Sequence, residues 1–176
     1  MKDKRRIAQL AFILAIITVI WVVLTAISSS QVNPQWNAAD YVKWAAKPDF
    51  VYYANYINVV LITFLATALF VLLYRILPSE FATGKMIGLI FIPVYCTLNL
   101  FAYSIQITLV PQMAQTSLIQ HEMLVFTSQL IQMNPQSIIG FVNGLAYAIL
   151  GIPSIIFGIY LVKETKKWSG WFLGLS

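Results

Sequence analysis

The fold is decided by the first 27 residues, which read MKDKRRIAQLAFILAIITVIWVVLTAI. A basic tip ends at Arg6, and residues 7–27 are then apolar apart from Gln9, Thr18 and Thr25. An α-helix needs about 20 predominantly apolar residues to cross the hydrocarbon core of a bilayer. The alternative is a cleaved signal peptide, but the apolar region of such a peptide has only about 7–15 residues. We therefore predict an uncleaved membrane span over residues 7–27.

Three further apolar stretches follow, over residues 51–73, 86–110 and 138–162. The chain is 60% hydrophobic and 10% charged, whereas soluble domains average about 45–50% apolar and about 25% charged residues. The sequence thus predicts an all-α integral membrane protein, a single domain (residues 1–176) built as a four-helix transmembrane bundle. Residues 168–176 are apolar again. They form either an interfacial tail or the start of a fifth span in a longer protein of five or six spans.

The two loops on the outer side cover residues 28–50 and 111–137, and both are expected to contain helix. In the first, Asn37 is a candidate cap for a short helix that runs to about Lys47, and Pro48-Asp49 indicates the start of the next span. In the second, Asn134-Pro135 indicates the start of the fourth span in the same way. The segment 112–132 is rich in glutamine and has no Lys or Arg. Its apolar residues recur at alternating four- and three-residue steps, which predicts one amphipathic outer-loop helix lying on the bundle or in the interface: Ile119, Met123, Phe126, Leu130 and Met133.

The basic residues predict which way the chain crosses the membrane. Nine of the eleven fall on one side of the four predicted spans and two on the other. Cytoplasmic loops carry the excess of Lys and Arg, so we expect a plasma-membrane protein with a cytoplasmic N-terminus and anionic lipids at its basic ends. The nine are Lys2, Lys4, Arg5, Arg6, Arg75, Lys85, Lys163, Lys166 and Lys167, and the two are Lys43 and Lys47.

The four spans contain no Asp, Glu, Lys, Arg or His. Ionisable residues at membrane depth mark proton relays, ion coupling and voltage sensing, so these functions are disfavoured. Cys96 and His121 are the only residues of their types, which excludes paired-cysteine and multi-histidine metal sites, and we expect no cofactor. His121 and Glu122 are adjacent and point in different directions on a helix. Nucleic acid is not expected as a partner, because the basic residues flank membrane spans.

Uncharged polar side chains in the spans are the candidate site. We expect them to face inward, because an unpaired amide in lipid costs several kcal/mol. They either form interhelical hydrogen bonds or line an outward-facing polar pocket that binds a small uncharged or amphiphilic ligand. The candidate ligand-binding residues are Asn58, Asn99, Tyr103, Gln106 and Asn143. With the predicted orientation, Asn99 falls near mid-depth and the other four fall in the outer half of the spans, as does Asn55.

Small residues at four-residue spacing predict a close helix contact in the fourth span. They are Gly140, Gly144 and Ala148, and small side chains let two helix backbones approach. The pattern leaves open whether the partner helix belongs to this chain or to another one.

The order of features resembles a group of small prokaryotic multi-span membrane proteins known only as domains of unknown function. The resemblance rests on the entry Arg5-Arg6-Ile7-Ala8, the loop Ala38-Ala39-Asp40-Tyr41 and the exit Leu73-Tyr74-Arg75. It implies that further spans follow, but it supplies no activity and no site residue.

The function predicted from the sequence is that of a non-catalytic membrane protein with a structural or binding role. The first alternative is a small-molecule transporter or binding subunit that uses the outward-facing polar pocket. The second is a lipid-modifying enzyme, which is disfavoured because the spans lack acid–base residues.

Overall fold

The computed structural model describes residues 2–77 and 79–173, and for residues 2–4, 79 and 164–173 it describes the backbone only. Helices and no strands are found among these residues, which confirms the all-α class. The four long helices are α1 (Lys2–Ser30), α3 (Phe50–Ile76), α4 (Ala82–Thr108) and α7 (Ile138–Leu173). Each contains a segment long and apolar enough to cross a membrane.

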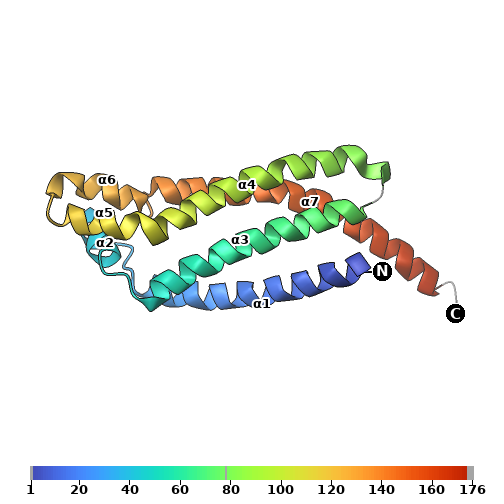
Figure 1. Ribbon diagram of the computed structural model, residues 1–176, viewed down its shortest axis with the longest axis horizontal. Helices are drawn as coiled ribbons and strands as arrows, with labels where there is room; N and C mark the ends of the chain where they lie inside the picture. Colours follow the sequence, from blue (N-terminus) through green and yellow to red (C-terminus); the bar gives the residue numbers. More distant parts are fainter. Residues whose placement is uncertain (1, 78, 174–176) are drawn as a thin grey trace.

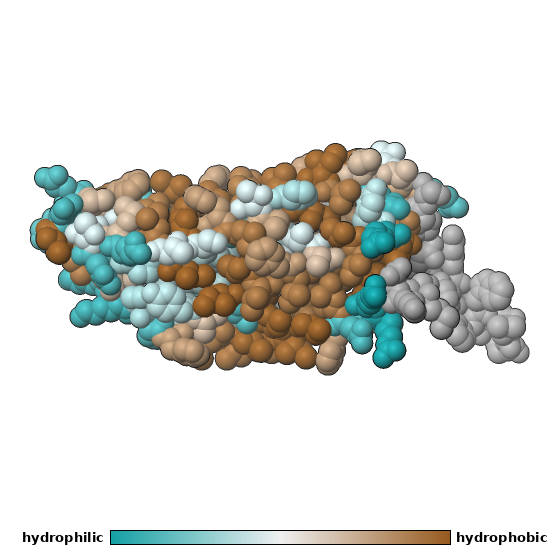
Figure 2. All heavy atoms as spheres, in the orientation of Figure 1, coloured by the Kyte–Doolittle hydropathy of each residue, from teal (hydrophilic) through white to brown (hydrophobic). Residues whose placement is uncertain are grey.

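The long helices stand side by side in the order α1, α3, α4, α7, and run alternately up and down (Figure 1). Helix α4 packs along both α3 and α7, whereas α1 packs along α3 at the edge of the group. Large apolar side chains on the other faces of α1 are exposed, among them Phe12, Val19 and Val22. Figure 2 shows the result on one face, a broad apolar band with hydrophilic residues gathered at its two ends.

Three short helices form a compact cap at one end of the long helices (Figure 1). They are α2 (Ala38–Ala45), α5 (Val110–Ser117) and α6 (Leu124–Leu130), and we use "cap" for these helices and the loops that join them. The opposite end, called the base here, holds the start of α1 and the 3-10 turn Ser79–Phe81. The cap has its own apolar core, made of Tyr41, Val42, Ala45, Ala46, Val110, Ala114 and Ile131.

The cap differs from the single amphipathic helix predicted over residues 112–132. The chain instead reverses between α5 and α6 through a short 3-10 turn, His121–Met123. Ile119, predicted on the packed stripe, is 83% exposed. Thr127, which is not on that stripe, is fully buried instead, and its hydroxyl lies 2.7 Å from the Ser117 hydroxyl across the hairpin. The prediction was wrong because one helical period was applied to two antiparallel segments.

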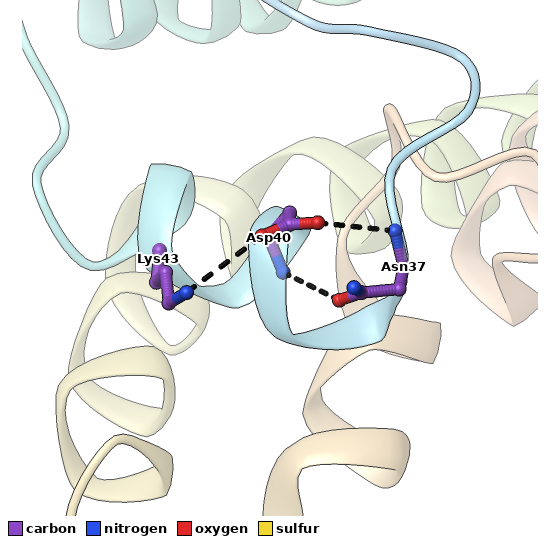
Figure 3. Close-up of polar contacts among 3 residues, drawn as sticks. All are labelled: Asn37, Asp40 and Lys43. Atoms are coloured by element: carbon purple, nitrogen blue, oxygen red, sulfur yellow. Dashed lines mark hydrogen bonds and ion pairs between the residues drawn. The ribbon is translucent and has the colours of Figure 1, made fainter.

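Two predicted helix starts are confirmed by their side-chain caps. The Asn37 side chain accepts a hydrogen bond from the Asp40 N–H, and the Asp40 carboxylate accepts one from the Asn37 N–H (Figure 3). Lys43 lies 3.7 Å from the same carboxylate. Asp49 caps α3 by accepting from the Tyr52 N–H at 2.7 Å. Both caps satisfy N–H groups that the first helical turn leaves free.

The last helix begins three residues later than Asn134-Pro135 predicts. The Asn134 side chain accepts from the Gln136 N–H within a turn, and the Ser137 hydroxyl accepts from the Gly140 N–H at the start of α7. At its other end, α7 continues beyond the predicted span end at residue 162 to Leu173 without a break. The predicted tail therefore continues this helix as far as Leu173, and residues 174–176 lie outside the described part.

Candidate functional site

Asn99 joins two long helices in the middle of the bundle. Its side chain is fully buried, and its amide N–H donates to the Thr63 hydroxyl of α3 at 2.6 Å. A longer contact of 3.4 Å reaches the Tyr95 hydroxyl one turn earlier. The Thr63 hydroxyl in turn donates to the Val59 carbonyl. Asn99 therefore makes the kind of interhelical contact that stabilises membrane helices.

Gln106 joins the bundle to the cap. Its amide N–H donates to the Leu130 carbonyl at 2.8 Å, and its amide oxygen accepts from the Gln132 N–H at 3.2 Å. Its own backbone carbonyl accepts from the Tyr52 hydroxyl of α3 at 2.9 Å. The side chain is fully buried. One residue thus holds together α3, α4 and the segment that leads from the cap into α7.

The three other predicted residues are spread over α3, α4 and α7. The Tyr103 hydroxyl lies 3.2 Å from the Tyr147 hydroxyl of α7. Asn58 and Asn143 are half-buried, and the side-chain oxygen of each is buried and has no hydrogen-bond partner among the residues that the structure describes. The Asn99 oxygen and the Tyr56 hydroxyl are unpartnered in the same way. No hydrogen bond joins any two of the five predicted residues within the described part of the chain, so their common pocket stays a prediction.

A cleft of about 410 Å³ lies in the cap, where sequence reasoning did not place a site. One wall is formed by α2 and the loop before it, and the other wall by α6 and the turn that leads into α7. Trp36, Asn37 and Tyr41 line it from the first pair of segments, and Ser128, Gln129 and Gln136 from the second. None of the residues that line it is charged, and none is a predicted site residue. Its walls are about 90 residues apart in sequence, so no local pattern could have indicated that they meet.

Tyr41 is one of the residues that line this cleft and is 2% exposed. Burial raises the pKa of its phenol above the ordinary value of 10.0, so the group stays neutral near neutral pH. Its hydroxyl donates to the Asn33 carbonyl at 3.4 Å. The Trp36 ring stands edge-on to the Tyr41 ring, with 5.6 Å between their centroids. The cleft is thus aromatic on one side and rich in amides on the other, without a charge.

His121 and Glu122 lie exposed in the 3-10 turn at the tip of the cap, and no hydrogen bond or ion pair joins them. Cys96 is a half-buried free thiol. Within the residues that the structure describes, no group of His, Cys, Asp and Glu is arranged to hold a metal ion.

Of the three small residues predicted to form a close helix contact, Gly140 packs near the segment before α7, where an added Cβ would lie 3.4 Å from the Gln132 carbonyl oxygen, whereas the other two make little contact within the described chain. Gly144 and Ala148 are exposed, and a Cβ added at Gly144 would meet nothing within 4 Å. The glycines that do allow close helix packing lie on α4. A Cβ at Gly88 would lie 3.0 Å from the Phe157 ring, and one at Gly84 would strike the Tyr160 hydroxyl.

No family model, curated protein or solved structure matches this chain, so the resemblance described above stays a prediction.

Proposed function

We propose that the chain is a multi-pass protein of the plasma membrane whose role is binding or structural, and that the long helices hold the cap at the outer surface. The three hydrogen bonds of Gln106 are the observation that carries this proposal. A fully buried amide that ties two spans to the cap fixes the cap relative to the membrane. Such a fixed surface suits recognition by a ligand or partner.

The orientation is supported by the distribution of charge between the two ends. Arg5, Arg6 and Arg75 are exposed near the base, and Lys163 stands over the Phe81 ring there. The cap side carries only Lys43 and Lys47 among the basic residues of the sequence. The base should therefore face the cytoplasm and the anionic lipids of that leaflet.

Cysteine labelling in intact cells tests the orientation. In a Cys96→Ala background, His121→Cys places a thiol at the tip of the cap and Glu80→Cys places one at the base. A membrane-impermeant maleimide should label the first in intact cells and the second only after the cells are opened. The reverse pattern would refute the proposed orientation.

The non-catalytic role is tested by complementation of a deletion strain. A His121→Ala, Glu122→Ala double variant should restore whatever the wild-type chain restores, because these exposed side chains make no side-chain contact with an acid or base among the described residues. Loss of complementation with normal protein level and labelling would support an enzyme instead.

A transporter or binding subunit with a polar pocket between the spans is the second candidate. The unpartnered oxygens of Asn58, Asn99 and Asn143 favour it, because buried polar atoms normally have a hydrogen-bond partner. Asn99→Leu should then abolish stabilisation by a transported ligand. If the variant is less stable and no solute raises the melting temperature of the wild type, the amides serve only helix contacts.

The exposed face of Gly144 and Ala148 is the proposed contact for a partner helix. This contact would be with another chain, because the face is open in this one.

A further inference from the structure

The cap cleft combines features that select one class of ligand. Its volume of about 410 Å³ falls within the range of about 300–1,000 Å³ typical of small-ligand sites. Its lining offers aromatic rings, amides and two hydroxyls, with no charged side chain. We propose that the cleft is a binding site for a small, neutral, polyhydroxylated molecule of the carbohydrate class. The inference rests on the proposed function in one respect, that the cap carries the recognition surface.

The amides supply the polar half of this recognition. Neither Gln129 nor Gln136 makes a side-chain hydrogen bond within the described chain, and the Asn37 amide uses only its oxygen, in the helix cap. An amide offers two donors and an acceptor, and each ligand hydroxyl is also both donor and acceptor. The pairing between them can therefore be complete. A charged ligand would lose its hydration in the cleft without gaining an opposite charge.

The aromatic side chains supply the apolar half. Trp36 is half-buried, and its edge-on contact with Tyr41 holds its ring in place at the cleft. Sugars present an apolar C–H face as well as hydroxyls, and the indole is a large ring with one N–H donor. The Trp36 indole N–H makes no hydrogen bond within the described chain, so it can donate one to a ligand.

The backbone around the cleft is fixed before any ligand binds. The Asn134 side chain donates to the Ser128 carbonyl at 2.9 Å, and the Ser137 hydroxyl donates to the Gln129 carbonyl at 2.9 Å. On the opposite wall, Asn37 and Asp40 cap α2 reciprocally. A preformed site binds more tightly because less ordering entropy is lost on binding.

The test is binding of four named sugars to the purified full chain. Maltose, trehalose, sucrose and N-acetylglucosamine would be titrated by calorimetry, with glutamate as a charged comparison. The detergent must carry no sugar headgroup, since maltosides and glucosides would occupy the cleft; lauryldimethylamine oxide is suitable. We expect at least one sugar to bind with a dissociation constant of millimolar or below and to raise the melting temperature, and glutamate not to bind.

Variants locate the binding. The double variant Gln129→Ala, Gln136→Ala should bind the sugar at least tenfold more weakly than the wild type. The separate variant Trp36→Ala should bind it more weakly still. Gln120→Ala is the matched control, because Gln120 is an exposed glutamine of the cap outside the cleft. Its affinity should equal that of the wild type. Circular dichroism and the melting temperature without sugar establish that each variant is folded.

Three results would overturn the inference: none of the four sugars binds, glutamate binds as well as they do, or binding is unaffected by the Gln129 and Gln136 changes. Labelling of His121→Cys separates this inference from the proposed function. If the cap is labelled from outside the cell and no sugar binds, only the carbohydrate site is refuted. If the cap is labelled only in opened cells, the proposed orientation fails whatever the sugars do.

Discussion

At the scale of single residues, the polar side chains of the spans differ in how completely they are paired. Both ends of the Gln106 amide are used. Asn99 uses its N–H groups and leaves its oxygen without a partner. An amide at membrane depth stabilises a fold only when its groups are satisfied, since no bulk water is available there. Gln106 is therefore the side chain whose removal should cost most.

We expect Gln106→Leu to lower the free energy of unfolding by about 2–4 kcal/mol, because the Leu130 carbonyl and the Gln132 N–H would both lose their partner in a buried region. Gln112→Leu is the control on an exposed glutamine and should change stability by at most about 0.5 kcal/mol. Thermal and denaturant unfolding in detergent micelles measure both. Equal stability of the two variants would contradict the role assigned to Gln106.

The Asp49 carboxylate, which caps the start of α3, should make the stability of the fold depend on pH. The Tyr52 N–H, and next the Gln31 amide at 2.9 Å, hold the pKa of its carboxyl below the ordinary value of 3.8. A depressed folded-state pKa stabilises the fold above the unfolded-state pKa, and this contribution is lost as the pH falls through the folded-state pKa. Gln31→Ala should raise the Asp49 pKa part of the way to its ordinary value in an NMR titration. An unchanged pKa would show that Gln31 does not contribute.

At the scale of elements, the sequence predicted helices where one local signal was sufficient. Four long apolar runs and the caps at Asn37 and Asp49 were read correctly, because composition and capping act over a few residues. The reversal after Ser117 was missed, since it depends on a hydroxyl contact with Thr127 ten residues later. The cap cleft was missed for a similar reason, because it depends on segments that lie still farther apart in the sequence. Its two walls meet only when α2 and α6 pack together.

Two glycines give a matched pair of substitutions, because Gly88 of α4 lies at the contact with α7 and Gly144 lies on the open face of α7. Gly88→Ala places a methyl group against the Phe157 ring, and we expect a loss of about 1–3 kcal/mol from overpacking. Gly144→Ala places the same group in open space and should be neutral, or should stabilise the helix by up to about 1 kcal/mol. Unfolding of the two variants under the same conditions decides the matter. A larger loss at Gly144 would place the close contact on the other face of α7.

At the scale of the whole molecule, apolar surface and charge affect different properties, the first compatibility with a bilayer and the second the orientation across it. The apolar band makes the four long helices compatible with a bilayer whichever end is inside, because its hydrophobicity has no direction. In the proposed orientation the basic residues determine the direction, and nine of the eleven lie in three separate segments of the sequence, at residues 2–6, 75–85 and 163–167. Each segment favours the same orientation, so the loss of one should be compensated by the other two.

This redundancy gives a graded prediction for topology. Arg5→Gln with Arg6→Gln should leave nearly all molecules with the cap outside, because Arg75, Lys85 and the lysines after the fourth span still act. Adding Gln112→Lys and Gln120→Lys on the cap should produce a measurable inverted fraction, since the difference between the two sides then becomes small. Impermeant labelling of His121→Cys in intact cells measures that fraction. If the first pair of changes alone inverted the protein, the first span would dominate and the later basic segments would have little influence.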